Sequence, residues 1–130
     1  MHTVDIIEAL AIERALQAFH DELESIADTS ARPGITRDDA TSLQERLRLT
    51  KGAIKQAAKH GTLSGSRQEP TELERCFYGP AIRSASASFR LRVDANPKSS
   101  EWQRGIDDVQ SELSYALHGL RKLIQEAQGT

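Results

Sequence analysis

Residues 102–124 read WQRGIDDVQSELSYALHGLRKLI, and this stretch decides the fold. Apolar residues recur in it at alternating steps of four and three positions, and in order they are Trp102, Ile106, Val109, Leu113, Ala116, Leu120 and Leu123. Positions spaced in this way share one side of an α-helix, and that side must be buried against other helices. The stretch therefore predicts an all-α protein of the helical-bundle type.

Two further helices are predicted in the first half of the chain. The first spans about residues 5–28, where apolar residues again follow steps of four and three and where Asp5 and Glu8 have capping-box spacing. The second follows a cap signal at Thr36 and stops at Gly61, where a C-terminal glycine belongs. Because only a short Pro-Gly turn separates the two helices, we expect them to pack antiparallel.

The third segment, residues 71–94, follows a polar loop at 61–70 and carries two conflicting patterns. Gly79-Pro80 interrupts a helical start, although proline is favourable in the first turn of a new helix. Residues 84–94, SASASFRLRVD, alternate as in a strand, whereas Ile82, Ala85, Phe89 and Val93 have helical spacing. We favour a helix, because a lone strand leaves its backbone groups unpaired. The alternative is an edge strand that pairs with a second copy or with a partner.

Together these patterns predict a single helical domain over residues 1–130, an up-and-down four-helix bundle with a kinked third helix. A chain of 130 residues buries about two-thirds of its unfolded surface, which is enough for a core without metal or disulfide support. Cys76 is the only cysteine, so no intrachain disulfide can form. Next to Phe77 and Tyr78, we interpret Cys76 as a small core residue.

Composition favours a cytoplasmic protein. The first residues, MHTVDIIEAL, lack the basic start and the unbroken apolar run of a signal peptide. No window approaches the roughly 18 consecutive apolar residues of a membrane span, so we expect no contact with a membrane.

The sequence lacks the common motifs of catalysis and cofactor binding. It contains no P-loop, no G-x-G-x-x-G and no G-x-S-x-G elbow. Its histidines lie far apart and have no zinc-finger or H-E-x-x-H spacing. His20 and Glu24 could share a helix face, but two ligands do not make a site. We therefore expect a protein that is not an enzyme, with no catalytic residues, no cofactor and no metal.

Charge is distributed unevenly, although the net charge is only −2. Residues 1–30 hold seven acids and one base, whereas residues 31–68 hold eight bases and three acids. One interpretation is that the two segments neutralise each other inside the fold. The other is that they form two separate interaction faces of opposite sign.

Residues 39–61 resemble a helix-turn-helix of the repressor kind. Leu47, Leu49, Ile54 and Ala57 fall near the apolar positions of that motif, and Thr50 could cap its second helix. The resemblance covers about 20 residues and departs from the motif at Gln44, where a small residue belongs, and at Arg48, where the turn glycine belongs. It implies a DNA-binding regulator whose groove-facing and phosphate-facing residues are Lys51, Lys55, Gln56 and Lys59.

Our first functional hypothesis is instead a non-enzymatic protein-binding module, such as a cytoplasmic inhibitor, immunity protein or antitoxin. This placement rests on analogy of fold class and size. The candidate contact residues are the acids near the end of the first helix, Asp21, Glu22, Glu24 and Asp28, which could steer a basic partner. The expected partner is another protein; we also consider a homodimer, and we do not expect nucleic acid.

Overall fold

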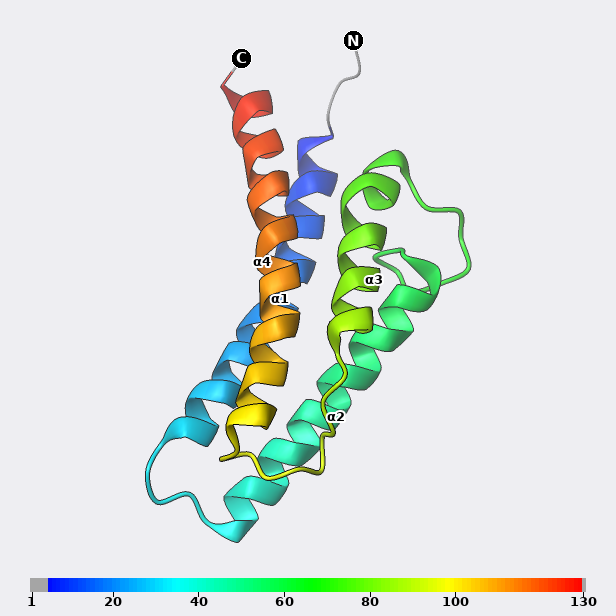
Figure 1. The fold of residues 1–130 in the computed structure, drawn as a ribbon. Coiled ribbons are helices and arrows are strands. Elements are labelled where there is room, and N and C mark those ends of the chain that lie inside the picture. Colours follow the sequence, from blue (N-terminus) through cyan, green and yellow to red (C-terminus); the bar gives the residue numbers. More distant parts are fainter. Residues whose placement is uncertain (1–4, 130) are drawn as a thin grey trace.

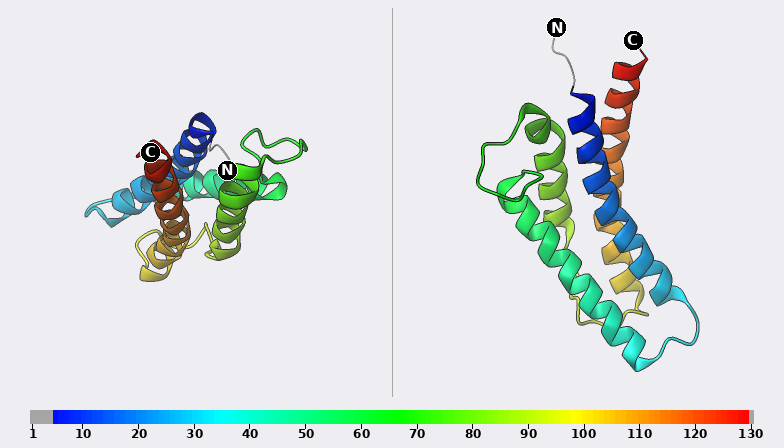
Figure 2. Two further views of the ribbon diagram at one scale, coloured as in Figure 1. Left: turned by 90° about the horizontal axis from the view of Figure 1, so that it is seen from above. Right: turned by 180° about the vertical axis from the view of Figure 1, so that it is seen from behind.

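The computed structural model describes residues 5–129 and shows four α-helices and one π-helical turn (Figure 1). The elements are α1 (Ile6–Ala31), α2 (Arg37–His60), η1 (Glu74–Tyr78), α3 (Gly79–Ser88) and α4 (Ser100–Gln128). Each helix packs on the next one along the chain, and α4 returns to pack on α1. Successive helices run in opposite directions, as the two views of Figure 2 also show. The predicted up-and-down four-helix bundle is confirmed.

Helix α1 begins where its cap signal predicts and ends three residues later than expected. The Asp5 carboxylate accepts a hydrogen bond from the Glu8 backbone N–H at 3.1 Å, which satisfies a free donor of the first turn. The helix continues past residue 28 to Ala31. It stops at Arg32, because the residue before Pro33 is disfavoured in the helical conformation.

Helix α2 is capped at both ends, as its sequence predicts. Thr36 and Asp39 form a reciprocal capping box, with bonds of 3.1 and 2.9 Å between each side chain and the other residue's backbone N–H. At the far end, Gly61 has φ +68°, a left-handed conformation that glycine adopts without steric cost. Between these caps the helix has no interruption.

The apolar stripe of α4 supplies much of the core. Its buried side chains are Trp102, Ile106, Val109, Leu113, Leu117, Leu120 and Ile124. In the second half of the helix, Leu117 and Ile124 are buried, and the predicted Ala116 and Leu123 are only half-buried. The stripe moves by one residue because a straight helix has 3.6 residues per turn, so a strict step of 3.5 drifts around it.

The third helix is irregular at the predicted place. It opens with a second capping box, in which the Glu74 carboxylate accepts from the Thr71 N–H at 2.8 Å and the Thr71 hydroxyl from the Glu74 N–H at 3.2 Å. In η1 the Gly79 N–H then bonds to the Glu74 carbonyl, five residues back. Pro80, which has no N–H, follows in the first turn of α3.

The interpretation of Cys76 as a core residue is wrong, because its side chain is exposed. Glu74 and Tyr78 are the buried residues of η1. Cys76 lies halfway between them along the turn, and this position points to solvent.

For residues 89–94 the predicted helix is also wrong, since α3 ends at Ser88. The strand alternative fails as well, because residues 5–129 contain no strand. Instead the chain lies in a non-regular path along the bundle, with Phe89 and Leu91 buried and Arg90 and Arg92 exposed. The alternation in the sequence therefore reports which side chains face the core.

Side chains of α2 and α4 take the place of a neighbouring strand for this segment. Lys51 Nζ donates to the Leu91 carbonyl at 3.2 Å, and Gln44 Nε2 donates to the carbonyls of Asp94 and Ala95 at 3.1 and 2.8 Å. The indole N–H of Trp102 reaches the Val93 carbonyl at 3.4 Å. These donors satisfy backbone acceptors that have no ladder partner. Residues 91–95 are thereby tied to both α2 and α4.

None of the helices in the described part of the chain has an apolar stretch long enough to cross a bilayer.

Truncation at the centre of α4 tests the core. Leu113 is fully buried, so Leu113→Ala is expected to lower the free energy of unfolding by about 2–5 kcal/mol. Its exposed neighbour Ser114 serves as control, and Ser114→Ala should change stability by no more than about 0.5 kcal/mol. Urea titration followed by circular dichroism measures both values. Equal stabilities for the two variants would mean that the stripe is not the core.

A second test concerns the packing of residues 89–94 on α4. A Cβ at Gly105 would lie 2.6 Å from the Leu91 Cβ, whereas one at Gly119 would meet nothing within 4 Å. Gly105→Ala should therefore destabilise the protein by about 1–3 kcal/mol. Gly119→Ala should stabilise it by up to about 1 kcal/mol through helix propensity. Thermal melts of both variants distinguish the outcomes, and stabilisation by Gly105→Ala would contradict this packing.

Candidate functional site

The four predicted contact acids do not form one cluster. Each residue turns an α-helix by about 100°, so Asp21, Glu24 and Asp28 share one side of α1, and Glu22 lies on another. Glu22 forms an ion pair with Arg46 of α2, in which Glu22 Oε1 and Arg46 Nη2 are 2.5 Å apart. Asp21, Glu24 and Asp28 are exposed. The structure thus brings three of the four acids together and assigns the fourth to the α1–α2 contact.

A hydrogen-bonded chain fixes Asp21 on this acidic side. Its Oδ1 accepts from Gln17 Nε2 at 2.6 Å and lies 3.4 Å from His20 Nδ1. The hydrogen bond from Gln17, followed by the interaction with His20, lowers the pKa of the Asp21 carboxyl. Gln17 is held in turn by Arg121 of α4, whose guanidinium also pairs with Glu13 at 2.9 Å.

Helix α4 faces the same side of α1 across a shallow hollow. His20 and Glu24 line it from α1, and Asp107, Gln110, Ser111 and Ser114 line it from α4. No basic side chain within residues 5–129 forms an ion pair with Glu24, Asp28 or Asp107. The hollow therefore keeps a negative charge that the fold does not neutralise.

Neutralisation between the acidic first segment and the basic second one is slight. In the part of the chain that the structure describes, Arg46–Glu22 is the only ion pair that joins α1 to α2. Lys55 and Lys59 are exposed on α2. Neutralisation by ion pairs is therefore limited to one contact between α1 and α2, and the two interaction faces remain a prediction.

The segment that resembles a helix-turn-helix does not have that geometry. Residues 39–60 lie within one continuous helix, and no residue other than glycine has a positive φ between residues 5 and 129. Arg48, in place of the turn glycine, is helical and pairs with Glu45 at 2.5 Å. Thr50, the proposed cap, is buried and donates to the Arg46 carbonyl at 2.9 Å. The turn required to present a recognition helix is missing.

The four candidate nucleic-acid contacts divide into two kinds. The Lys51 side chain points toward residues 89–91. Its Nζ lies 5.4 Å from the centroid of the Phe89 ring and donates a hydrogen bond to the Leu91 carbonyl. Burial, and then the charge of Lys55, lower the pKa of Lys51. Lys55, Gln56 and Lys59 remain exposed on α2. Lys51 therefore has a structural role in holding residues 89–91.

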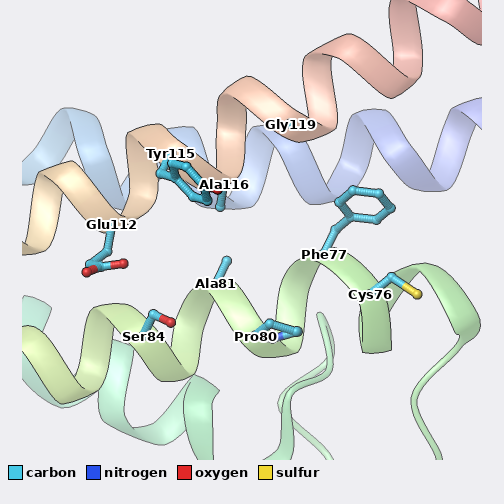
Figure 3. Close-up of a pocket in the computed structure, with 9 residues that line it drawn as sticks. All are labelled: Cys76, Phe77, Pro80, Ala81, Ser84, Glu112, Tyr115, Ala116 and Gly119. Atoms are coloured by element: carbon cyan, nitrogen blue, oxygen red, sulfur yellow. The ribbon is translucent and has the colours of Figure 1, made fainter.

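An apolar groove that sequence reasoning missed lies between the third and fourth helices (Figure 3). Its lining comprises Cys76, Phe77, Pro80, Ala81, Ser84, Glu112, Tyr115, Ala116 and Gly119, and its volume is about 260 Å³. Figure 3 shows Glu112 and Ser84 at one end and Phe77 and Cys76 at the other. The side chain of Tyr115 is 83% exposed beside it.

The groove adjoins a second, more polar depression. Arg90 and Ser88 line that depression from the end of the third helix, and Asp108 and Glu112 line it from α4. Glu112 is common to both. One end of the apolar groove is therefore bordered by Glu112 and, beyond it, by Asp108 and Arg90.

Comparison with known protein families, with curated proteins and with solved structures finds no match for this chain. The functional inference consequently depends on the surfaces of the molecule itself.

The missing turn leads to a prediction about DNA. We expect no salt-dependent binding of duplex DNA by the wild-type protein, measured by gel shift and fluorescence anisotropy between 50 and 200 mM salt, a range over which phosphate contacts weaken binding strongly. The control is the pair Lys55→Ala and Lys59→Ala, which removes exposed charge without touching the Lys51 contacts. A wild-type gel shift that this double variant abolishes would contradict the prediction.

Proposed function

We propose that this chain is a non-enzymatic protein-binding module of the inhibitor, immunity or antitoxin kind, and that it holds an amphipathic, basic helix of a partner protein. The observation that carries the proposal is the apolar groove between α3 and α4, with Tyr115 and Phe77 along it and carboxylates at one end.

The size of the groove favours side chains over a cofactor. Small-molecule sites typically enclose about 300–1,000 Å³ around a few convergent polar groups, whereas this groove has about 260 Å³. Its small residues, Ala81, Ala116 and Gly119, allow a helix to approach closely. Such a groove is suited to the apolar anchors of a helix.

Aromatic residues supply the expected affinity. Tyrosine is enriched among the residues that dominate binding energy in protein interfaces. Tyr115 is nearly fully exposed, so a partner that covers it removes a large apolar ring from water. Leu49 of α2 is also an exposed apolar residue, at 58%, but it does not line the groove.

Charge complementarity indicates a basic partner. Glu112 lines the groove, Asp108 and Arg90 line the depression that adjoins it, and Asp21, Glu24 and Asp28 are exposed on α1. Exposed charges of this kind raise the rate of association with an oppositely charged protein and contribute less to the affinity itself. The predicted role of the three α1 acids is therefore steering.

The groove is tested by affinity capture from the native host with matched baits. The wild type and Leu49→Ala should retain the same protein after nuclease treatment, and Tyr115→Ala should lose it, with binding of the purified pair weakened at least 10-fold. A larger Kd follows because Tyr115→Ala removes the central aromatic contact. Thermal melts check that all baits are equally folded.

Two results would refute the proposal. One is a partner that Tyr115→Ala retains and Leu49→Ala loses, which would move the interface to α2. The other is a captured nucleic acid in place of a protein.

A further inference from the structure

We propose that, when no other partner is bound, a second copy of this chain occupies the apolar groove with the exposed side of its α2. This inference rests on the proposed function, because it assigns an occupant to the same groove. It also names a form of regulation, since a partner protein then has to displace the second copy.

The groove is bordered by two stripes of residues with the same helical spacing. One stripe runs from Phe77 to Ser84 on η1 and α3, and the other runs from Glu112 to Gly119 on α4 (Figure 3). In both, the lining residues stand at positions i, i+3, i+4 and i+7, which cover two turns of a helix, or about 10.5 Å. A groove between two such stripes suits one further helix that presents the same spacing.

The exposed side of α2 presents that spacing. Its stripe consists of Leu49, Gly52, Ala53 and Gln56, and all four residues are exposed. Leu49 is 58% exposed and Tyr115 beside the groove is 83% exposed, and both belong to the four large apolar side chains that lie exposed within residues 5–129. Each surface therefore leaves one large apolar side chain in water, and a contact between copies covers both.

Each of the two surfaces also contains a glycine in the interior of a helix. A Cβ at Gly52 of α2 or at Gly119 of α4 would meet nothing within 4 Å, so the packing of the single chain requires neither glycine. Glycine inside a helix lowers the stability of that helix relative to alanine, and it lets another backbone approach closely. Contact between copies accounts for both glycines, because it brings these two helices together.

Charge favours the same pairing and gives it a direction. Lys55 and Lys59 are exposed along one edge of the α2 stripe and form no ion pair within residues 5–129. Glu112 is the one charged residue in the groove lining that the structure describes. With Lys55 beside Glu112, Leu49 lies about 9 Å further along the docked helix, at the Phe77 end of the groove.

The test is sedimentation equilibrium of the full chain at concentrations up to about 1 mM, which detects contacts with a Kd at or below that value. The wild type should associate as its concentration rises. Leu49→Ala and Tyr115→Ala should each weaken association about 10-fold, because each removes the large apolar side chain of one surface. Ile7→Ala is the matched control and should change nothing, since Ile7 is 82% exposed but lies on α1, outside both surfaces.

A mixture of two variants separates this contact from other kinds of self-association. The α2 stripe and the groove share no residue, so the contact is heterologous. Leu49→Ala keeps an intact groove and Tyr115→Ala keeps an intact α2 stripe. An equimolar mixture of the two should therefore form dimers that contain one copy of each variant, although each variant alone associates weakly.

The two glycines provide variants whose effect cannot come from a loss of folding. Gly52→Gln and Gly119→Gln should each raise the melting temperature through helix propensity. Each should nevertheless weaken association about 10-fold, because a side chain at either position keeps the two helices apart. A higher melting temperature with undiminished association would contradict the proposed contact.

Three further results would overturn the second copy as the occupant: a wild type that stays monomeric over the whole concentration range, association that neither Leu49→Ala nor Tyr115→Ala weakens, or a mixture that forms no dimers. None of them refutes the proposed function, which depends on a captured protein that Tyr115→Ala loses. Dimers in the mixture without any such captured protein would refute the proposed function alone.

Discussion

The burial of one side of α4 is the constraint on which the rest of the structure depends. This helix packs on α1 and α3, and its apolar stripe fixes how both are rotated. Residues 89–94 also rest on it, because Gly105 leaves room for the Leu91 side chain. The close approach then brings the backbone carbonyls of this segment within reach of Lys51 and Gln44 on α2. One packed surface thus positions α1, α3 and the non-helical residues 89–99.

Local signals in the sequence are sufficient for the helices and insufficient for residues 89–94. Capping residues such as Asp5 and Thr36 act on backbone groups within three positions, so their effect can be read from spacing alone. The alternation in residues 84–94 has two physical origins that spacing cannot separate, namely a strand in a sheet or an irregular segment with one covered side. Donors 40 and 51 residues away, Lys51 and Gln44, decide between them by satisfying the carbonyls of Leu91 and Ala95.

From the sequence, the candidate surfaces could be predicted only as an uneven distribution of charged residues along the chain. The excess of acids in residues 1–30 is visible in the sequence, and so is the rotation that separates Glu22 from Asp21 and Glu24. The ion pair between Arg46 and Glu22 depends on how α2 packs on α1, which the sequence does not show. The apolar groove has no sequence signal of its own, because lining residues such as Ala116 belong to the apolar stripe that is predicted as core. They become a surface feature since the third and fourth helices leave a gap above Ala81 that no other element fills.

Polar and aromatic side chains at the surface of this bundle divide by what the fold requires of them. Within the described residues, the only side chains of α2 that donate hydrogen bonds to residues 91–95 are those of Lys51 and Gln44. Both side chains therefore have a structural role. Tyr115, Glu24 and Asp107 have no comparable task, since Tyr115 is exposed and the two acids form no ion pair within residues 5–129. They lie instead around two hollows on adjacent sides of α4.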